Sequence, residues 1–180
     1  MFLSAINFNA DIGDWETDKV VNMEKMFNGA ISFNRDIGTW NTGSVKNMDY
    51  MFQGASKFNK DIGSWDTSNV TSMEAMFKNC DAFNNGQAVM YDHNGLDITG
   101  MPEKPLLWNT SQVTNMTEMF RHALVFSQEI NTVDEFWNTG SVLDMSYMFE
   151  PSYTYFESPE YHTVYVDSRF NEYIGDWDVS

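Results

Sequence analysis

The chain has 180 residues, of which 42% are hydrophobic and 16% aromatic, so length and composition predict one folded domain. The formal net charge of −16 excludes nucleic-acid and anionic-membrane surfaces, because both need clustered Lys and Arg, of which the chain has only ten. One cysteine, Cys80, excludes an internal disulfide and a zinc site built from several thiolates. No apolar run is long enough for a membrane-spanning helix, and no signal peptide is visible.

The first elements in chain order are three copies of one 25-residue unit. They read FNADIGDWETDKVVNMEKMF at 8–27, FNRDIGTWNTGSVKNMDYMF at 33–52 and FNKDIGSWDTSNVTSMEAMF at 58–77. A fixed period of this length is typical of repeat proteins whose units stack, so that equivalent residues form columns along the stack.

The columns continue to the end of the chain, interrupted by insertions. Tryptophans recur at spacings of 25, 25, 43, 29 and 40 residues, which places three insertions near 86–105, 131–134 and 153–167. We predict that the columns are structural. Their clearest members are Trp15, Trp40, Trp65, Trp108 and Trp137, the acidic residues Asp11, Asp36 and Asp61, and the methionines Met23, Met48 and Met73.

Within a unit, two segments predict regular secondary structure. Phe and Ile lie four residues apart in 58–63, which predicts a short strand that buries both. Apolar residues at i, i+3, i+6 and i+7 in 70–77 predict one face of a short helix. The expected fold is therefore an α/β repeat solenoid of about six coils, each with a short parallel β-strand and a short helical turn.

The two ends of the chain fall inside repeat units. Met1 and Phe2 lie 25 residues before Met26 and Phe27, and the chain stops at 177–180, shortly after the sixth Trp. We expect one solenoid domain over 1–180 that is either a piece of a longer protein or covered at its ends by another molecule, because an open coil exposes apolar surface.

The pattern FNxDIGxWxTxxVxxMxxMFxxA closely resembles the BspA-type leucine-rich repeats, a surface-protein family that includes mycoplasma lipoproteins. The resemblance covers the chain outside the three insertions. It implies a leucine-rich-repeat solenoid, a cell-surface or extracellular location, and a role in adhesion or protein binding.

The aspartate and tryptophan columns each allow a functional interpretation. Stacked carboxylates about 4.8 Å apart would suit a cation ladder or the acid pair of a glycosidase, whereas turn amides bound to each carboxylate are a simpler explanation. A tryptophan column would suit sugar stacking if exposed, and core packing if buried. We favour the structural interpretation of both columns.

Two insertions contain the candidate binding residues. Tyr91 and Asp92 begin a stretch with the Asp-x-Asn-Gly-x-Asp character of a calcium loop, although a solvated turn explains it as well. The insertion at 153–167 is rich in tyrosine, which is enriched in binding surfaces. Its candidate residues are Tyr153, Tyr155, Tyr161 and Tyr165.

The sequence predicts a non-enzymatic protein- or surface-interaction module, with no catalytic residues, metal or cofactor. Its expected partner is a protein or a cell-surface ligand, without nucleic acid and without direct membrane insertion of this segment. One alternative is a structural subunit of a larger assembly. Another is a glycan-active or calcium-dependent glycan-binding solenoid.

Overall fold

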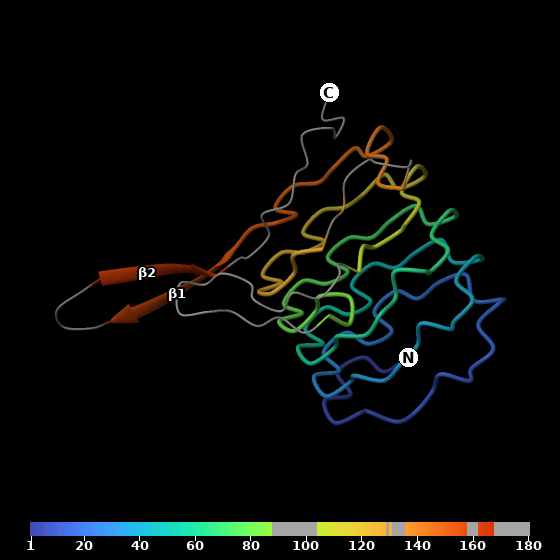
Figure 1. The fold of residues 1–180 in the computed structure, drawn as a ribbon, viewed down its shortest axis with the longest axis horizontal. Coiled ribbons are helices and arrows are strands. Elements are labelled where there is room, and N and C mark those ends of the chain that lie inside the picture. Colours follow the sequence, from blue (N-terminus) through green and yellow to red (C-terminus); the bar gives the residue numbers. More distant parts are fainter. Residues whose placement is uncertain (88–103, 129, 131–135, 158–161, 168–180) are drawn as a thin grey trace.

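The computed structural model describes residues 1–87, 104–128, 130, 136–157 and 162–167. The repeat units lie side by side in a stack, and the two strands form a hairpin that extends away from it (Figure 1). These strands are β1 (Ser152–Glu157) and β2 (His162–Asp167), and they pair antiparallel. The described residues contain no helix, and the strands lie outside the repeats. The predicted α/β repeat solenoid, with a strand and a helical turn in every coil, is therefore wrong.

The segment predicted as a helix is a series of tight turns. The N–H of Met76 donates to the carbonyl of Met73 at 3.3 Å, and the N–H of Cys80 donates to that of Phe77 at 3.0 Å. Ala75, inside the first of these turns, has φ of +50°, a left-handed conformation that a right-handed helix cannot contain. Apolar residues three apart meet on one side of such turns as well as on a helix, so the sequence period did not distinguish the two.

The left-handed residue recurs at the same position of each unit. The positive φ angles lie between 50° and 59° at Lys25, Tyr50, Ala75, Glu118 and Tyr147. A residue other than glycine costs about 1–2 kcal/mol in this conformation, so other contacts must hold it there.

Hydrogen bonds between units hold these turns in place. The N–H of Ala75 donates to the carbonyl of Thr117 at 2.8 Å, and the N–H of Phe77 donates to that of Met119 at 2.9 Å. Within one segment, alternate N–H groups therefore bond to the next unit and the intervening ones close turns. The intervening N–H groups bond inside their own unit, so they do not pair with the next one. Neighbouring units therefore pair through single parallel bridges, such as the one between Ser72 and Asn115, and do not form continuous strands.

Side-chain amides explain why the predicted strand at 58–63 is missing. The N–H of Asn59 donates to the Oδ1 atom of Asn34 at 3.0 Å, and Asn34 does the same to Asn9. The Asn side chain thus takes the place of a backbone carbonyl, and a backbone ladder cannot form at this column.

The core consists of aromatic columns that run along the stack. The rings of Phe27, Phe52 and Phe77 are nearly parallel, with centroids 5.5 and 5.6 Å apart. The ring of Phe52, at the end of one copy, lies 4.1 Å from that of Phe58, at the start of the next. Offset parallel rings at such distances attract one another in addition to burying apolar area. Met23, Met48 and Met73 are buried beside them.

The tryptophans form a further buried column. Neighbouring indole rings lie 6.3–6.5 Å apart from Trp15 to Trp137. The Nε1–H of Trp40 donates to the carbonyl of Ile12 at 3.0 Å, and later tryptophans repeat this bond. Trp40 is 4% exposed whereas Trp15 is 41% exposed, so the column is covered everywhere except at the first unit.

The stacking continues across the first insertion. Trp65 and Trp108 are 43 residues apart in sequence, but their rings stack at 6.5 Å as in adjacent copies. The units on the two sides of the insertion therefore stack in the same register as adjacent copies.

Glycines in one column permit the close approach of neighbouring units. A Cβ atom at Gly38 would lie 2.6 Å from the backbone oxygen of Asp61, whereas one at Gly43 would first meet a side-chain atom, the Oδ2 of Asp66, at 3.0 Å. We expect Gly38→Ala to lower the free energy of unfolding by about 1–3 kcal/mol, because the backbone oxygen must move. Gly43→Ala is the matched control and should change stability by no more than about 1 kcal/mol in either direction.

Urea denaturation of the two variants and the unsubstituted chain measures this difference. Equal stability of the two variants would contradict the close packing of units at Gly38.

Candidate interaction site

The structure describes three of the six predicted binding residues. Tyr153 and Tyr155 lie on β1, and Tyr165 lies on β2. Tyr91, Asp92 and Tyr161 lie outside the described residues, and so does the proposed calcium loop. The tyrosine-rich insertion thus contributes the hairpin that extends from the stack (Figure 1).

The hairpin has a regular register. Tyr153 pairs with Val166 and Tyr155 with Val164, whereas Thr154 pairs with Tyr165. Because alternate residues of a strand belong to opposite faces, the first two pairs share one face of the hairpin. On that face, each of these two tyrosines of β1 is therefore paired with a valine of β2.

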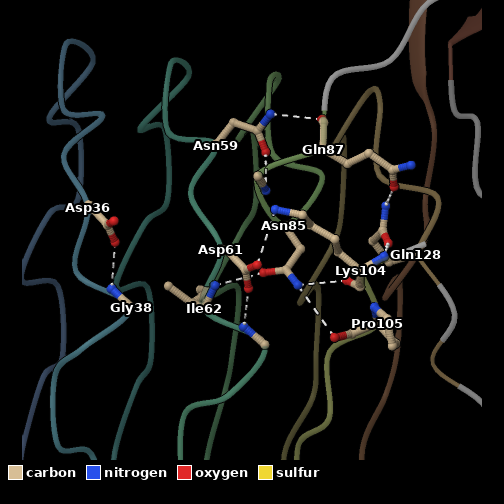
Figure 2. Close-up of polar contacts among 12 residues, drawn as sticks. Asp36, Gly38, Asn59, Asp61, Ile62, Asn85, Gln87, Lys104, Pro105 and Gln128 are labelled. Atoms are coloured by element: carbon tan, nitrogen blue, oxygen red, sulfur yellow. Dashed lines mark hydrogen bonds and ion pairs between the residues drawn. The ribbon is translucent and has the colours of Figure 1, made fainter. Parts of the chain in front are cut away.

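A network of amide side chains lies beside the residues that border the first insertion (Figure 2). Asn85 is fully buried, and its Oδ1 accepts a hydrogen bond of 2.8 Å from the N–H of Ile62. Its Nδ2 donates to the carbonyl of Lys104 at 2.7 Å. One side chain thus connects the third unit with the residue at which the described chain resumes after the insertion.

Two glutamines complete this network. The Nε2 of Gln128 donates to the Oε1 of Gln87 at 2.6 Å, and the Oε1 of Gln128 accepts from the N–H of Lys104 at 2.8 Å. Gln87 and Lys104 are the described residues on either side of the insertion, and Gln128 bridges them from the following unit. Both glutamines are buried, so these bonds form in a low-dielectric environment where an unsatisfied amide is costly.

The network was not predicted, although the sequence contained a signal. The unit that starts at Phe83 loses the Asp-Ile-Gly motif and reads Asn85-Gly86-Gln87, and the next one reads Ser127-Gln128 in place of Asn with its following residue. These departures from the repeat are the residues that fix the ends of the insertion.

The aspartate column has the simpler of its two explanations. The Oδ1 atoms of Asp36 and Asp61 accept hydrogen bonds from the N–H groups of Gly38 and Gly63, at 3.0 and 3.2 Å (Figure 2). Asp11 makes the same turn, and all three aspartates are exposed. Within the described ranges, no three His, Cys, Asp or Glu side chains come together as metal ligands.

Ion pairs between units form on the surface of the turn segments. Glu118 contacts Lys78 of the preceding unit and Arg121 of its own, and chiefly the hydrogen bond from Lys78 holds the pKa of the Glu118 carboxyl below its usual value. Because the pKa of Glu118 is lower in the folded chain than in the unfolded chain, its ion pairs stabilise the fold fully at pH values above the unfolded-chain pKa. This stabilisation is lost as the pH falls through the folded-state pKa.

Cys80 is a packing residue. It is fully buried in the small-residue column, with its Sγ atom 3.1 Å from the carbonyl oxygen of Ala55. Burial raises the pKa of the thiol well above its usual value, so the nucleophilic thiolate is suppressed.

The described residues also contain no helix long and apolar enough to cross a membrane. The chain matches the family model described as "Mycoplasma protein of unknown function, DUF285" at residues 1–92 and 103–164. No curated protein and no solved structure matches the chain.

The amide network yields a test by an isosteric substitution. Asn85→Asp keeps the acceptor for Ile62 but places a carboxylate oxygen against the carbonyls of Lys104 and Pro105. We expect a loss of about 2–3 kcal/mol in unfolding free energy at neutral pH, because a buried donor is removed and a charge is added. Asn69→Asp is the matched control, because Asn69 is exposed and its side-chain amide also donates to a backbone carbonyl. We expect this control to lower the unfolding free energy by about 0.5 kcal/mol.

Urea titrations at several pH values separate the effect of the added charge on stability from the effect of the lost hydrogen-bond donor. A buried carboxyl has a raised folded-state pKa, so the deficit of Asn85→Asp relative to the unsubstituted chain should shrink as the pH falls through that value. A deficit equal to that of Asn69→Asp at every pH would show that the network does not hold the base of the insertion.

Proposed function

The chain belongs to the family of Mycoplasma proteins of unknown function described as DUF285, and we propose that it is a non-enzymatic protein-interaction module. The hairpin carries the recognition, and the stack of units supports it. In keeping with the resemblance to BspA-type surface proteins, we place this module at the cell surface, with a protein or surface ligand as its partner.

The observation that favours this function is the projecting hairpin. β1 and β2 pair over six residues each and extend away from the stack (Figure 1). An isolated two-stranded hairpin is marginally stable in water, and additional strands or a packed face stabilise it. A partner that packs on the face defined by Tyr153 and Tyr155 would supply that stabilisation, and tyrosine gives large contact area at low entropy cost.

The stack provides a rigid support for this hairpin. The described chain leads directly from the last turn segment into β1, since the N–H of His122 donates to the carbonyl of Glu150 at 2.9 Å and β1 starts at Ser152. A binding element that is fixed in advance loses less conformational entropy when the partner binds.

Neither alternative gains support from the described residues. The described tryptophans after Trp15 are buried, so they offer no platform for sugar stacking, and the aspartate carboxylates bond to their own turns. Nothing in this part of the chain favours the glycan-active solenoid or a structural role in an assembly.

We expect replacement of Tyr153, Tyr155, Tyr161 and Tyr165 by Ser to weaken partner binding at least about 100-fold, because tyrosines are frequent hot spots of interfaces. The measurement is a binding isotherm of the labelled chain on intact cultured animal cells and on the surface of mycoplasma cells. Tyr147→Ser is the control, since Tyr147 is 63% exposed but lies on the stack, and it should leave the isotherm unchanged.

The urea midpoint of the stack should be the same in all three proteins. Saturable binding that survives the four substitutions would contradict the assignment to the hairpin. Absence of saturable binding by the unsubstituted chain would contradict the interaction function itself.

A further inference from the structure

The sheet of β1 and β2 has no third strand among the described residues. Each strand therefore has an outer edge, along which every second residue directs its backbone N–H and C=O groups away from the hairpin. Both strands have six residues, so half of the six on either edge can pair with a further strand. Two strands alone are marginally stable in water, and a third strand would stabilise them.

These edges lack the features by which proteins usually prevent strand addition. Such features are proline, lysine, β-bulges and charges within the strand. The sequences of β1 and β2, SYTYFE and HTVYVD, contain neither proline nor lysine, and their acidic residues stand only at the last position of each strand. The pairing is continuous, without a bulge, from Ser152 with Asp167 to Glu157 with His162. The backbone of the hairpin is therefore suited to accept another strand.

The charge of the hairpin favours a cationic partner over a second copy of the chain. Residues 152–167 contain three acidic residues, Glu157, Glu160 and Asp167, and no Lys or Arg. The whole chain has a formal net charge of −16. Opposite charges on neighbouring strands stabilise their pairing, whereas like charges destabilise it. Two hairpins of this chain would repel each other, and a basic segment would be attracted.

One of the two edges has a pattern that fits such a segment. Tyr153, Tyr155 and Glu157 occupy alternate positions of β1 and so belong to one face of the hairpin. A strand added at the outer edge of β1 would have its own alternate residues next to these three. The β2 residues paired with them are two valines and a histidine, which offer a cation neither a tyrosine ring nor a carboxylate.

We propose that the outer edge of β1 binds an extended basic segment of another protein as a third strand. This inference rests on the proposed function of the hairpin and adds the chemistry of its partner. Lys or Arg at alternate positions of the segment would neighbour Tyr153, Tyr155 and Glu157, since cations are attracted to tyrosine rings and to carboxylates. Main-chain hydrogen bonds would supply affinity, and the alternate side chains would supply specificity.

The probe is a capped, fluorescently labelled peptide of sequence RTRVRT, titrated onto the full chain. We expect saturable binding with a Kd on the order of 10–100 µM. The matched peptide carries N-methyl groups on its two central residues, which block pairing along both of its edges but keep every charge and side chain. We expect it to bind about tenfold more weakly, because main-chain hydrogen bonds are lost.

Infrared spectroscopy tests strand formation separately from affinity. With isotopic labels at the central carbonyls of RTRVRT, the labelled amide band should move to the position of a β-sheet when the chain is added. Attraction between charges alone would leave this band where it is in the free peptide.

A pair of protein variants locates the binding. Glu157→Lys and Asp14→Lys both change the net charge by two, from −16 to −14, and Asp14 is exposed on the stack. Glu157→Lys should weaken binding of RTRVRT about fivefold to tenfold, because an attraction becomes a repulsion on the neighbouring strand. Asp14→Lys should weaken it less than about twofold, since it changes only long-range attraction that salt screens.

Equal affinity of the two peptides, or an unshifted amide band, would overturn the inference. A dimer of the chain in sedimentation analysis, joined through the hairpin, would also overturn it, because a second copy would then occupy the edge. If neither peptide binds but the four tyrosine substitutions abolish cell binding, only this inference fails. If cell binding survives those substitutions, the proposed function fails as well.

Discussion

In the part of a unit that contains its Met residues, such as 48–52, alternate backbone N–H groups donate to the carbonyls of the next unit. The rest of the architecture depends on these hydrogen bonds between units. Met48, Tyr50 and Phe52 bond to the third unit, and the intervening amides close turns within their own unit. The turns require a left-handed residue at Tyr50 and its equivalents. That strained conformation persists because hydrogen bonds on both sides over-determine it.

Polar side chains of the repeat donate further hydrogen bonds to backbone carbonyls of neighbouring units. Trp65 donates to the carbonyl of Ile37, and Thr42 to that of Asp66. These donors are buried and recur once per unit, so each unit contributes the same hydrogen bonds as its neighbours. The aromatic columns can then stack in register, since every unit has the same backbone path.

The sequence predicted the repeat, its insertions and the residues of its columns, because these are consequences of periodicity alone. It did not predict the secondary structure. A spacing of three between Val70, Met73 and Met76 is compatible with tight turns as well as with a helix, and only the left-handed Ala75 separates the two. The strand predicted at 58–63 is absent because an Asn side chain, and not a backbone carbonyl, accepts the hydrogen bond from the N–H of Asn59.

The candidate site was predictable only in part, for a related reason. Stacking residues are repeated, so they can be recognised by comparing one unit with another. Residues that hold an insertion occur once, and Asn85 and Gln128 were visible only as departures from the pattern. The proposed function likewise depends on a feature outside the regular repeat, the hairpin of β1 and β2.

The bonds between units can be observed directly as scalar couplings across hydrogen bonds in an NMR spectrum of the isotopically labelled chain. The structure predicts couplings from the amide nitrogen of Tyr50 to the carbonyl carbon of Glu74, and from that of Phe52 to Met76. Couplings from Tyr50 and Phe52 to carbonyl carbons four residues earlier in the same unit would instead indicate a helix. That result would contradict the stack of turns from which the rest of the structure is built.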